Sequence, residues 1–566
     1  MNPLKLVFLW HMHQPDYRNY ETGEFMLPWV YLHAIKDYTD MAYHLEAHPA
    51  MKAVVNFVPV LLDQIEDYSA QFASGQLRDP LLRLLGMPDL DNLAMNERLR
   101  IFDSCFRSNH TTMMQPYPAY RRLHEMHERF SERGEAELAY LSGQYLSDLL
   151  VWYHLAWTGE SVRRSNETIV RLMTQGAGFT YTDRTLLLDL IGQLIRDLIP
   201  RYRKLAASGQ IELSSTPHYH PLAPLLIDFS CARDSTPGVE LPAESAYPGG
   251  KSRVASQLSS AIKSHTRRFG APPCGVWPAE GGISTAFLEL VAEQDCQWAG
   301  SGEGVLVNSL HKSYPAEPLP ERDHYLYRAY QVTNKADGLI CFFRDERLSD
   351  MIGFEYSKWF GRDAAEHLVH SLEDISSRTQ LDETPVVSII LDGENAWEYY
   401  PYNGYYFLND LYGIIENHEA IQSTTYRDHI ASMKQAEVAA LPILAAGSWV
   451  YGTFSTWIGD REKNRAWDLL CAAKHSYDLV IQSGRLTADE TAKAERQLAS
   501  CESSDWFWWL GDYNPPHIVE SFDKLFRANL ANLYGLLKLP VPVSVLEAIS
   551  HGGGTSEVGG TMRRAS

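Results

Sequence analysis

Histidine and acidic side chains recur in one kind of place in this sequence, directly after short runs of apolar residues. Such runs, separated by long stretches with helical spacing, are typical of buried parallel strands. The polar residues that follow them are His11, His13, His218, His220, Glu280, Arg344, Asp345, Asp392 and Glu394. Because the carboxyl ends of parallel strands meet at one edge of a sheet, we expect these side chains to converge there.

Two of these acids have surroundings suited to acid–base chemistry. Glu280 lies in the segment 277–282, between a Trp-Pro step and two glycines that allow a ligand to approach closely. Asp392 ends the apolar run 386–391, where burial would raise the pKa of the carboxyl group, as a general acid requires. The competing interpretations are an exposed loop glutamate and an aspartate that caps a helix.

The histidines occur in two pairs with the same spacing. His11 and His13 would point to one side of a strand, and His218 and His220 would do so in a loop stiffened by flanking prolines. Either pair could donate hydrogen bonds to substrate hydroxyls, or a histidine could be bonded to a carbonyl as part of the fold. A metal site is a further interpretation, but two histidines alone are a weak metal signal.

Aromatic residues suggest the kind of ligand. The chain has 31 Tyr, 14 Trp and 20 Phe, and the segment 503–512 places four aromatic rings beside Asp505. Aromatic rings in loops suit sugar rings, although a buried hinge between domains would have the same composition. Two carboxylates, several histidines and many tryptophans, without a phosphate loop or a nucleophile elbow, favour the hydrolysis or transfer of glycosides.

The elements that position these residues follow from the hydrophobic pattern. The apolar runs predict seven strands, at 5–10, 53–58, 210–214, 275–277, 297–300, 338–343 and 386–391. Helical spacing predicts helices at 79–85, 119–130, 135–157, 185–205, 463–482, 488–502 and 520–536. The pattern predicts an α/β fold whose parallel sheet is covered on both faces, as a closed barrel or an open doubly wound sheet.

This pattern also predicts the domain organisation. We expect residues 1–400 to form the catalytic domain, with a helical insertion at about 62–205, because that stretch is too long for one crossover helix. Residues 401–545 would form a C-terminal helical domain that contributes to the active-site cleft. The segment 546–566 is rich in Gly, Ser and Thr and is predicted to be a flexible tail.

Composition excludes several classes of partner. The 566 residues include 50 Lys and Arg against 71 Asp and Glu, for a net charge of −21, which argues against nucleic acid or an anionic membrane as partner. The seven cysteines are widely spaced without a CxxC motif, so neither a disulfide framework nor a structural zinc is expected. The apolar run 6–10 is too short for a signal peptide, which predicts a cytoplasmic location.

Five motifs in this order resemble the sequence regions of glycoside hydrolase family 57. They are His13-Gln14-Pro15, the segment from Glu212 to His220, Trp277-Pro278-Ala279-Glu280, Leu391-Asp392-Gly393-Glu394-Asn395 and Ser504-Asp505-Trp506. The resemblance extends from about residue 4 to 510. The segment 342–354 is similar to the amylase and amylopullulanase members of that family.

The resemblance implies a seven-stranded (β/α) barrel and retaining cleavage of α-1,4-glucans by an amylase or amylopullulanase type of enzyme, without a cofactor or a catalytic metal. It implies that Glu280 is the nucleophile and Asp392 the general acid/base. The residues that it implies around the cleavage point are His13, His220, Trp277, Trp397, Asp505 and Trp506, with His11 as a lesser candidate. The expected partner is an α-glucan or a malto-oligosaccharide, and the oligomeric state stays open.

Three other functions stay open at this point. The same chemistry serves a 4-α-glucanotransferase or a glycogen branching enzyme. The histidine pair near the N-terminus could instead bind zinc, as in α-mannosidase-like enzymes or deacetylases. The third is a glucan-binding protein without turnover, and the presence of both Glu280 and Asp392 counts against it.

Overall fold

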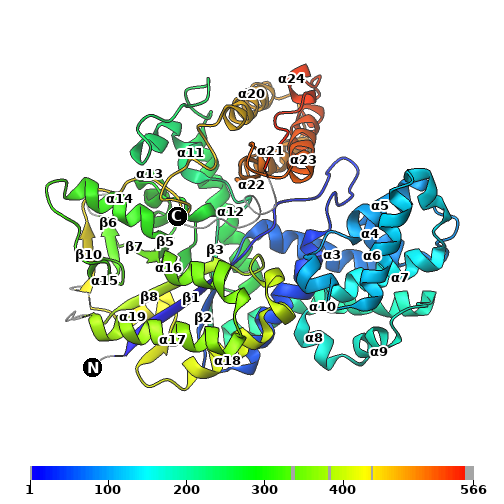
Figure 1. The fold of residues 1–566 in the computed structure, drawn as a ribbon. Helices are drawn as coiled ribbons and strands as arrows, with labels where there is room; N and C mark the ends of the chain where they lie inside the picture. Colours follow the sequence, from blue (N-terminus) through cyan, green and yellow to red (C-terminus); the bar gives the residue numbers. More distant parts are fainter. Residues whose placement is uncertain (1–2, 333–337, 380–383, 435–436, 555–566) are drawn as a thin grey trace.

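The computed structural model describes residues 3–332, 338–379, 384–434 and 437–554. Its centre is a sheet of ten strands in the order β10-β6-β7-β5-β4-β3-β2-β1-β8, with β9 paired to β1 (Figure 1). The strands are β1 (Leu4–Met12), β2 (Ala53–Phe57), β3 (Ile211–Ser215), β4 (Gly275–Val276), β5 (Trp298–Gly302), β6 (Tyr330–Val332), β7 (Ile340–Arg344), β8 (Val386–Asp392), β9 (Ile421–Ser423) and β10 (Ala439–Leu441). The predicted α/β fold is confirmed.

Seven neighbouring strands, β7-β5-β4-β3-β2-β1-β8, are parallel and correspond to the seven apolar runs. They are buried almost throughout, because one face packs against helices while the side chains of the other face, such as Val7, Val54 and Ile390, form a separate core inside the curled sheet. The two end strands of this set meet, since the Asp345 amide that follows β7 donates to the Ser388 carbonyl of β8 at 2.8 Å. The sheet is therefore strongly curled.

The predicted count of seven strands is wrong, because β6, β9 and β10 add to it. Each has three residues, and the central residue of β9 is exposed, so none forms an apolar run long enough to be recognised. β6 and β10 lie beyond β7 at one margin of the parallel set, with β6 antiparallel to β7, whereas β9 pairs with the first residues of β1 inside the set. The result is a mixed sheet rather than a sheet of seven parallel strands.

Helices fill the long connection between β2 and β3. They are α3 (Pro59–Ser74), α4 (Pro80–Leu85), α5 (Met95–Cys105), α6 (Pro118–Ser131), α7 (Gly143–Ala156), α8 (Glu160–Ser165), α9 (Glu167–Gln175) and α10 (Tyr181–Ala207). Figure 1 shows α4 to α9 extending to one side of the sheet. The predicted helix at 135–157 is two elements, a 3-10 helix at Glu135–Tyr140 and α7, because the Ser142 hydroxyl caps α7 by accepting from the Tyr145 amide.

Helices α20 (Arg461–Gln482), α21 (Ala488–Cys501), α22 (Asp505–Trp509), α23 (Pro516–Leu536) and α24 (Val543–Leu546) form the C-terminal part. They pack above the sheet in the view of Figure 1, and α21 packs on α23. Part of the predicted tail is packed, since Ile549 is buried and its amide donates to the Asp523 carboxylate at 2.9 Å. Residues 555–566 of that tail lie outside the described residues.

The remaining helices cover the sheet. They are α1 (Trp29–His33), α2 (Thr39–Ala47), α11 (Ala223–Ile227), α12 (Gly250–Phe269), α13 (Thr285–Ala292), α14 (Glu303–Ser313), α15 (Arg322–Tyr325), α16 (Glu346–Asp350), α17 (Gly361–Arg378), α18 (Tyr405–Glu416) and α19 (Tyr426–Ser432). Within the described residues, no helix combines the length and apolar character that crossing a bilayer requires. All seven cysteines are free thiols.

Candidate active site

A cavity of about 800 Å³ lies at the carboxyl ends of the parallel strands. Six of the predicted site residues line it, namely His11, His13, His220, Glu280, Asp392 and Asp505. Strand pairing explains part of this convergence, because β1 is the central neighbour of β2 and β8 and sets His11 level with both Asn56 and Asp392. Helix α22 brings Asp505 to the same cavity from the C-terminal part.

Glu280 sits on a strained turn directly after β4. Its backbone has φ of 57°, a left-handed conformation that non-glycine residues rarely adopt. Gly281 also has a positive φ, and a Cβ there would lie 3.0 Å from both Trp277 and Trp449, so glycine permits this close approach. The Ser504 hydroxyl donates to the Glu280 carboxylate at 2.9 Å. The turn therefore holds this carboxyl group in a constrained position.

Asp392 ends β8 and is tied to the loop that follows. The Asn395 side chain donates to its carboxylate at 2.8 Å. Glu394 accepts from the His13 amide at 3.2 Å and from the Tyr38 hydroxyl at 3.1 Å. These contacts fix the loop after β8 against the loop after β1, so Asp392 and His13 have a defined relative position.

The two carboxyl groups have strongly perturbed ionisation. Burial and repulsion from Asp505 and Asp392 raise the pKa of Glu280 to about 8. Burial also raises the pKa of Asp392 to about 6, against the lowering effect of the hydrogen bond from Asn395. Between these values the pair carries one proton, as a mechanism with one ionised and one protonated carboxyl group needs.

Three histidines and one acid form a stacked cluster beside Glu280. The ring centroids of His13 and His220 are 3.7 Å apart, and those of His11 and His220 are 5.2 Å apart. Asp505 binds His13 Nε2 through both carboxylate oxygens, at 2.8 and 3.0 Å, across 492 positions of sequence. Burial, followed by the neighbouring imidazoles, lowers the pKa of His220 well below its usual value, so its ring is neutral.

A chain of hydrogen bonds connects Asn56 on β2 with Glu280. His11 Nδ1 lies 2.6 Å from Asn56 Oδ1, and His11 Nε2 lies 3.1 Å from His220 Nε2. His220 Nδ1 is in turn 2.9 Å from the Ser504 hydroxyl that contacts Glu280. If the Asn56 oxygen accepts from His11, then His220 donates at Nε2 and accepts at Nδ1. The Ser504 hydroxyl has one proton for two neighbours, so it donates to the Glu280 carboxylate when that group is ionised and can turn to His220 when Glu280 is protonated.

The cluster also has the donor types of a metal site. His13, His220 and Asp505 each offer one ligand atom, and these atoms lie within 4.8 Å of one another. His13 Nε2 already faces both oxygens of Asp505 at hydrogen-bond distance. The same side chains therefore satisfy one another as a hydrogen-bonded pair, and three donors at these distances would also suit a divalent ion.

Three predicted residues lie behind the cavity rather than in its wall. Trp277, Trp397 and Trp506 are almost fully buried. The indole of Trp397 donates to the Gly393 carbonyl at 3.0 Å, and that of Trp506 donates to the Ser500 carbonyl at 2.9 Å. The rings of Trp397 and Trp506 therefore support the segments that carry Asp392 and Asp505, and the role of all three tryptophans in shaping the subsite stays a prediction.

Other aromatic rings form the wall in their place. Those that line the cavity and were not predicted as site residues are Tyr17, Trp29, Phe106, Trp157, Tyr399, Trp449, Trp508, Trp509 and Phe522. Trp508 and Trp509 belong to the aromatic segment 503–512, so composition indicated them in part. Trp449 and Trp29 follow no strand and belong to no recognised motif, and only the folded chain brings them here.

Comparison with known proteins supplies the class. The sequence matches glycosyl hydrolase family 57 over residues 7–442. This chain belongs to that family. It is therefore an enzyme of the glycoside hydrolase class, and the resemblance stated from its motifs is confirmed. No curated protein sequence matches the chain.

Three solved structures have a similar fold. A family 57 branching enzyme from Thermococcus kodakaraensis has a TM-score of 0.59 at 14% identity, with 96% of this chain and 94% of that chain covered. An α-amylase from Thermotoga maritima has a TM-score of 0.55 at 12% identity, with 95% and 93% covered. A 4-α-glucanotransferase from Thermococcus litoralis has a TM-score of 0.50 at 14% identity, with 94% and 60% covered. At these identities the likeness concerns the fold.

Proposed function

We propose that this family 57 enzyme cleaves α-1,4-glucans with retention of configuration. Glu280 is the nucleophile and attacks the anomeric carbon, while protonated Asp392 gives its proton to the departing glycosidic oxygen. The glycosyl–Glu280 ester is then resolved by water or by a sugar hydroxyl, from which Asp392 removes a proton. The second step returns both carboxyl groups to their starting state.

The observation that carries this proposal is that the carboxyl groups of Glu280 and Asp392 line one cavity, where partial burial raises the pKa of both. In the free enzyme the higher pKa belongs to Glu280, so the shared proton resides mainly on Glu280, whereas the proposed mechanism requires it on Asp392. A minor protonation state of the free enzyme can be the reactive one, because the number of protons on the pair is already correct.

The surrounding residues support a glucan as substrate. The neutral imidazoles of His11 and His220 use both ring nitrogens within the hydrogen-bond chain, so they hold the cluster in place. Asp505 and Asn395 in the cavity wall offer polar groups to sugar hydroxyls. The aromatic wall adds flat surfaces on which sugar rings pack. The structurally similar proteins named above, a branching enzyme, an α-amylase and a 4-α-glucanotransferase, support the same class of substrate.

Hydrolysis of the amylase type is the principal proposal, and glucan transfer or branching is the alternative from the same chemistry. Incubation with maltoheptaose separates them, because hydrolysis yields only shorter sugars and transfer yields longer or branched ones. NMR of the first product formed should detect the α-anomer in either case. A β-anomer as first product, or no reaction with any α-glucan, would contradict the proposal.

A zinc-dependent reaction is the remoter alternative, and the spacing of His13, His220 and Asp505 favours testing it. We expect prolonged treatment with EDTA to leave the turnover of maltoheptaose unchanged, because the proposed steps use only carboxyl groups. Loss of activity in EDTA that zinc restores would replace the two-carboxylate mechanism. A cytoplasmic location remains a prediction from the sequence.

A further inference from the structure

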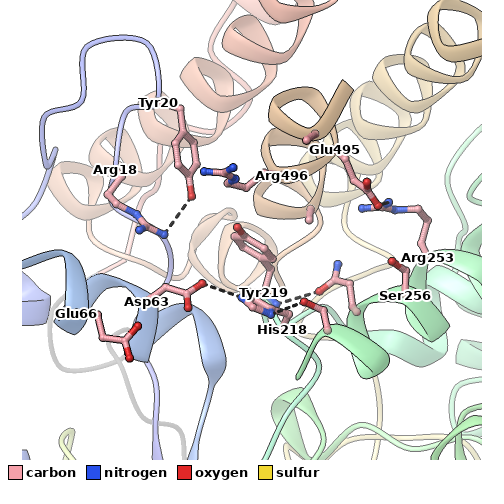
Figure 2. A pocket seen from close by; sticks show the side chains of 14 residues that line it. Arg18, Tyr20, Asp63, Glu66, His218, Tyr219, Arg253, Ser256, Glu495 and Arg496 are labelled. Atoms are coloured by element: carbon pink, nitrogen blue, oxygen red, sulfur yellow. Dashed lines mark hydrogen bonds and ion pairs between the residues drawn. The ribbon is translucent and has the colours of Figure 1, made fainter. Parts of the chain in front are cut away.

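A second cavity, of about 570 Å³, lies on the other face of the segment 217–220 that supplies His220 to the active site. His218 and Tyr219 line this second cavity, whereas His220 lines the first. Its other walls come from the N-terminal segment that carries Arg18 and Tyr20 and from helices α3, α12 and α21 (Figure 2). The two cavities therefore share one stretch of backbone as a wall.

The charges around the second cavity are mostly paired with one another. Arg18 makes two hydrogen bonds of 2.8 Å to Asp16, and Arg253 binds Glu502 at 2.7 and 3.1 Å. The imidazole of His218 lies 2.8 Å from Asp63. An anionic ligand needs an excess of positive charge, whereas the lining balances three arginines, Arg18, Arg253 and Arg496, with three acids, Asp63, Glu66 and Glu495. A neutral ligand is therefore favoured.

Polar groups and aromatic rings nevertheless remain available to a ligand. Figure 2 shows Tyr20, Tyr219 and Arg496 directed toward a common space. The Arg496 guanidinium lies 5.8 Å from the Tyr20 ring centroid, is exposed, and makes no hydrogen bond or ion pair with any described residue. The exposed Ser256 hydroxyl lines the opposite side. Flat rings edged by hydroxyl and guanidinium groups match the alternating apolar faces and hydroxyl rims of a sugar ring.

We propose that this cavity is a second carbohydrate-binding site, which takes one or two sugar units of an α-glucan without cleaving them. The choice of an α-glucan as ligand rests on the proposed function, because a site that shares a wall with the catalytic cavity meets the same substrate. The site carries no pair of carboxyl groups with a shared proton, since Asp63 is held ionised by its contacts with His218 and Arg268.

The test counts binding sites on the full chain. Isothermal titration of maltotriose into the Glu280→Gln variant, which cannot turn the sugar over, should give two sites per chain. Ala492→Trp adds a ring at an exposed cavity position of α21 and should leave one site. Arg496→Ala should weaken binding at one of the two sites by at least about tenfold, since a hydrogen bond to a charged group is lost.

Ala488→Trp is the matched control, because Ala488 is also exposed on α21 but does not line the cavity, so both sites should remain. One site in the Glu280→Gln parent, or two sites in Ala492→Trp, would overturn the proposal. Displacement of maltotriose from this site by inorganic phosphate would overturn the assignment to a neutral ligand. Turnover of maltoheptaose by the wild type is measured in parallel, so that failure of the proposed function and failure of the second site give different results.

Discussion

The two cavities on either face of the segment 217–220 differ in the direction in which they shift the pKa of their carboxyl groups. In the active site, burial raises the pKa of Glu280 and of Asp392. Among the described residues, the only basic side chain within 4.0 Å of either carboxyl group is His220, whose ring is neutral. In the second cavity, Asp63 is half-buried, and hydrogen bonds from His218 and Arg268 lower its pKa. Glu280 and Asp392 can therefore exchange a proton near neutral pH, whereas Asp63 stays ionised.

This difference teaches what separates a catalytic from a structural or binding carboxyl group in the same neighbourhood. An acid without a cation retains its proton to higher pH and can exchange it during a reaction. An acid with a cation stabilises the folded chain and takes no part in proton transfer. Substitutions in the two cavities should therefore affect different measurements.

The largest expected effect is that of Glu280→Gln. Removal of the nucleophile should lower kcat for maltoheptaose by at least about 10⁴-fold, because no covalent intermediate can form. The control is Glu66→Gln in the second cavity, which should retain activity. A comparable loss of kcat in Glu280→Gln and Glu66→Gln would mean that catalysis is not confined to the first cavity.

Asp392→Asn should have the next largest effect. Loss of the general acid should slow cleavage of maltoheptaose by about 10²–10⁴-fold, while an activated aryl α-glucoside, whose leaving group needs no proton, should be affected much less. The two substrates provide the internal comparison, measured as kcat/KM on the same preparation. Equal losses on both would remove Asp392 from the acid role.

Arg253→Met tests the opposite cavity through stability. Glu502 has no exposed surface and loses both hydrogen bonds from the guanidinium, so the free energy of unfolding should fall by about 3 kcal/mol. Urea denaturation measures this change. The exposed Arg485→Met should change stability by less than about 0.5 kcal/mol. Equal stability of both variants would show that the buried pair contributes nothing.

The smallest expected effect is that of pH: kcat/KM should fall about tenfold for each pH unit below the lower or above the upper apparent pKa of the pair. Activity should rise with pH through about 6, as the pair loses its first proton, and fall through about 8, as it loses its second. Initial rates across the range measure both limbs. In Asp392→Asn, with one titrating carboxyl group left, the profile should retain a single limb, and two unchanged limbs would assign the titration to other groups.

Much of the sheet and of the site could be predicted from local pattern. A strand buried on both faces needs a continuous apolar run, and the parallel strands β1 and β8 show one throughout. The sequence alone therefore predicts that Glu280 and Asp392 follow the ends of buried strands. The short β9 and β10 could not be predicted in this way, because strands of three residues carry no distinct pattern.

The sequence by itself determined the class of the enzyme, since five ordered motifs and the acids at strand ends depend only on residues close together in the chain. Tertiary structure decided which rings face the cavity. Trp277 is buried although it directly precedes the Glu280 turn, whereas Trp449, distant in sequence, reaches the wall, where its amide donates to the Glu280 carbonyl at 3.0 Å. The pairing of His13 with Asp505 joins residues 492 positions apart, and no local pattern encodes a contact that forms only when the C-terminal helices pack above the sheet.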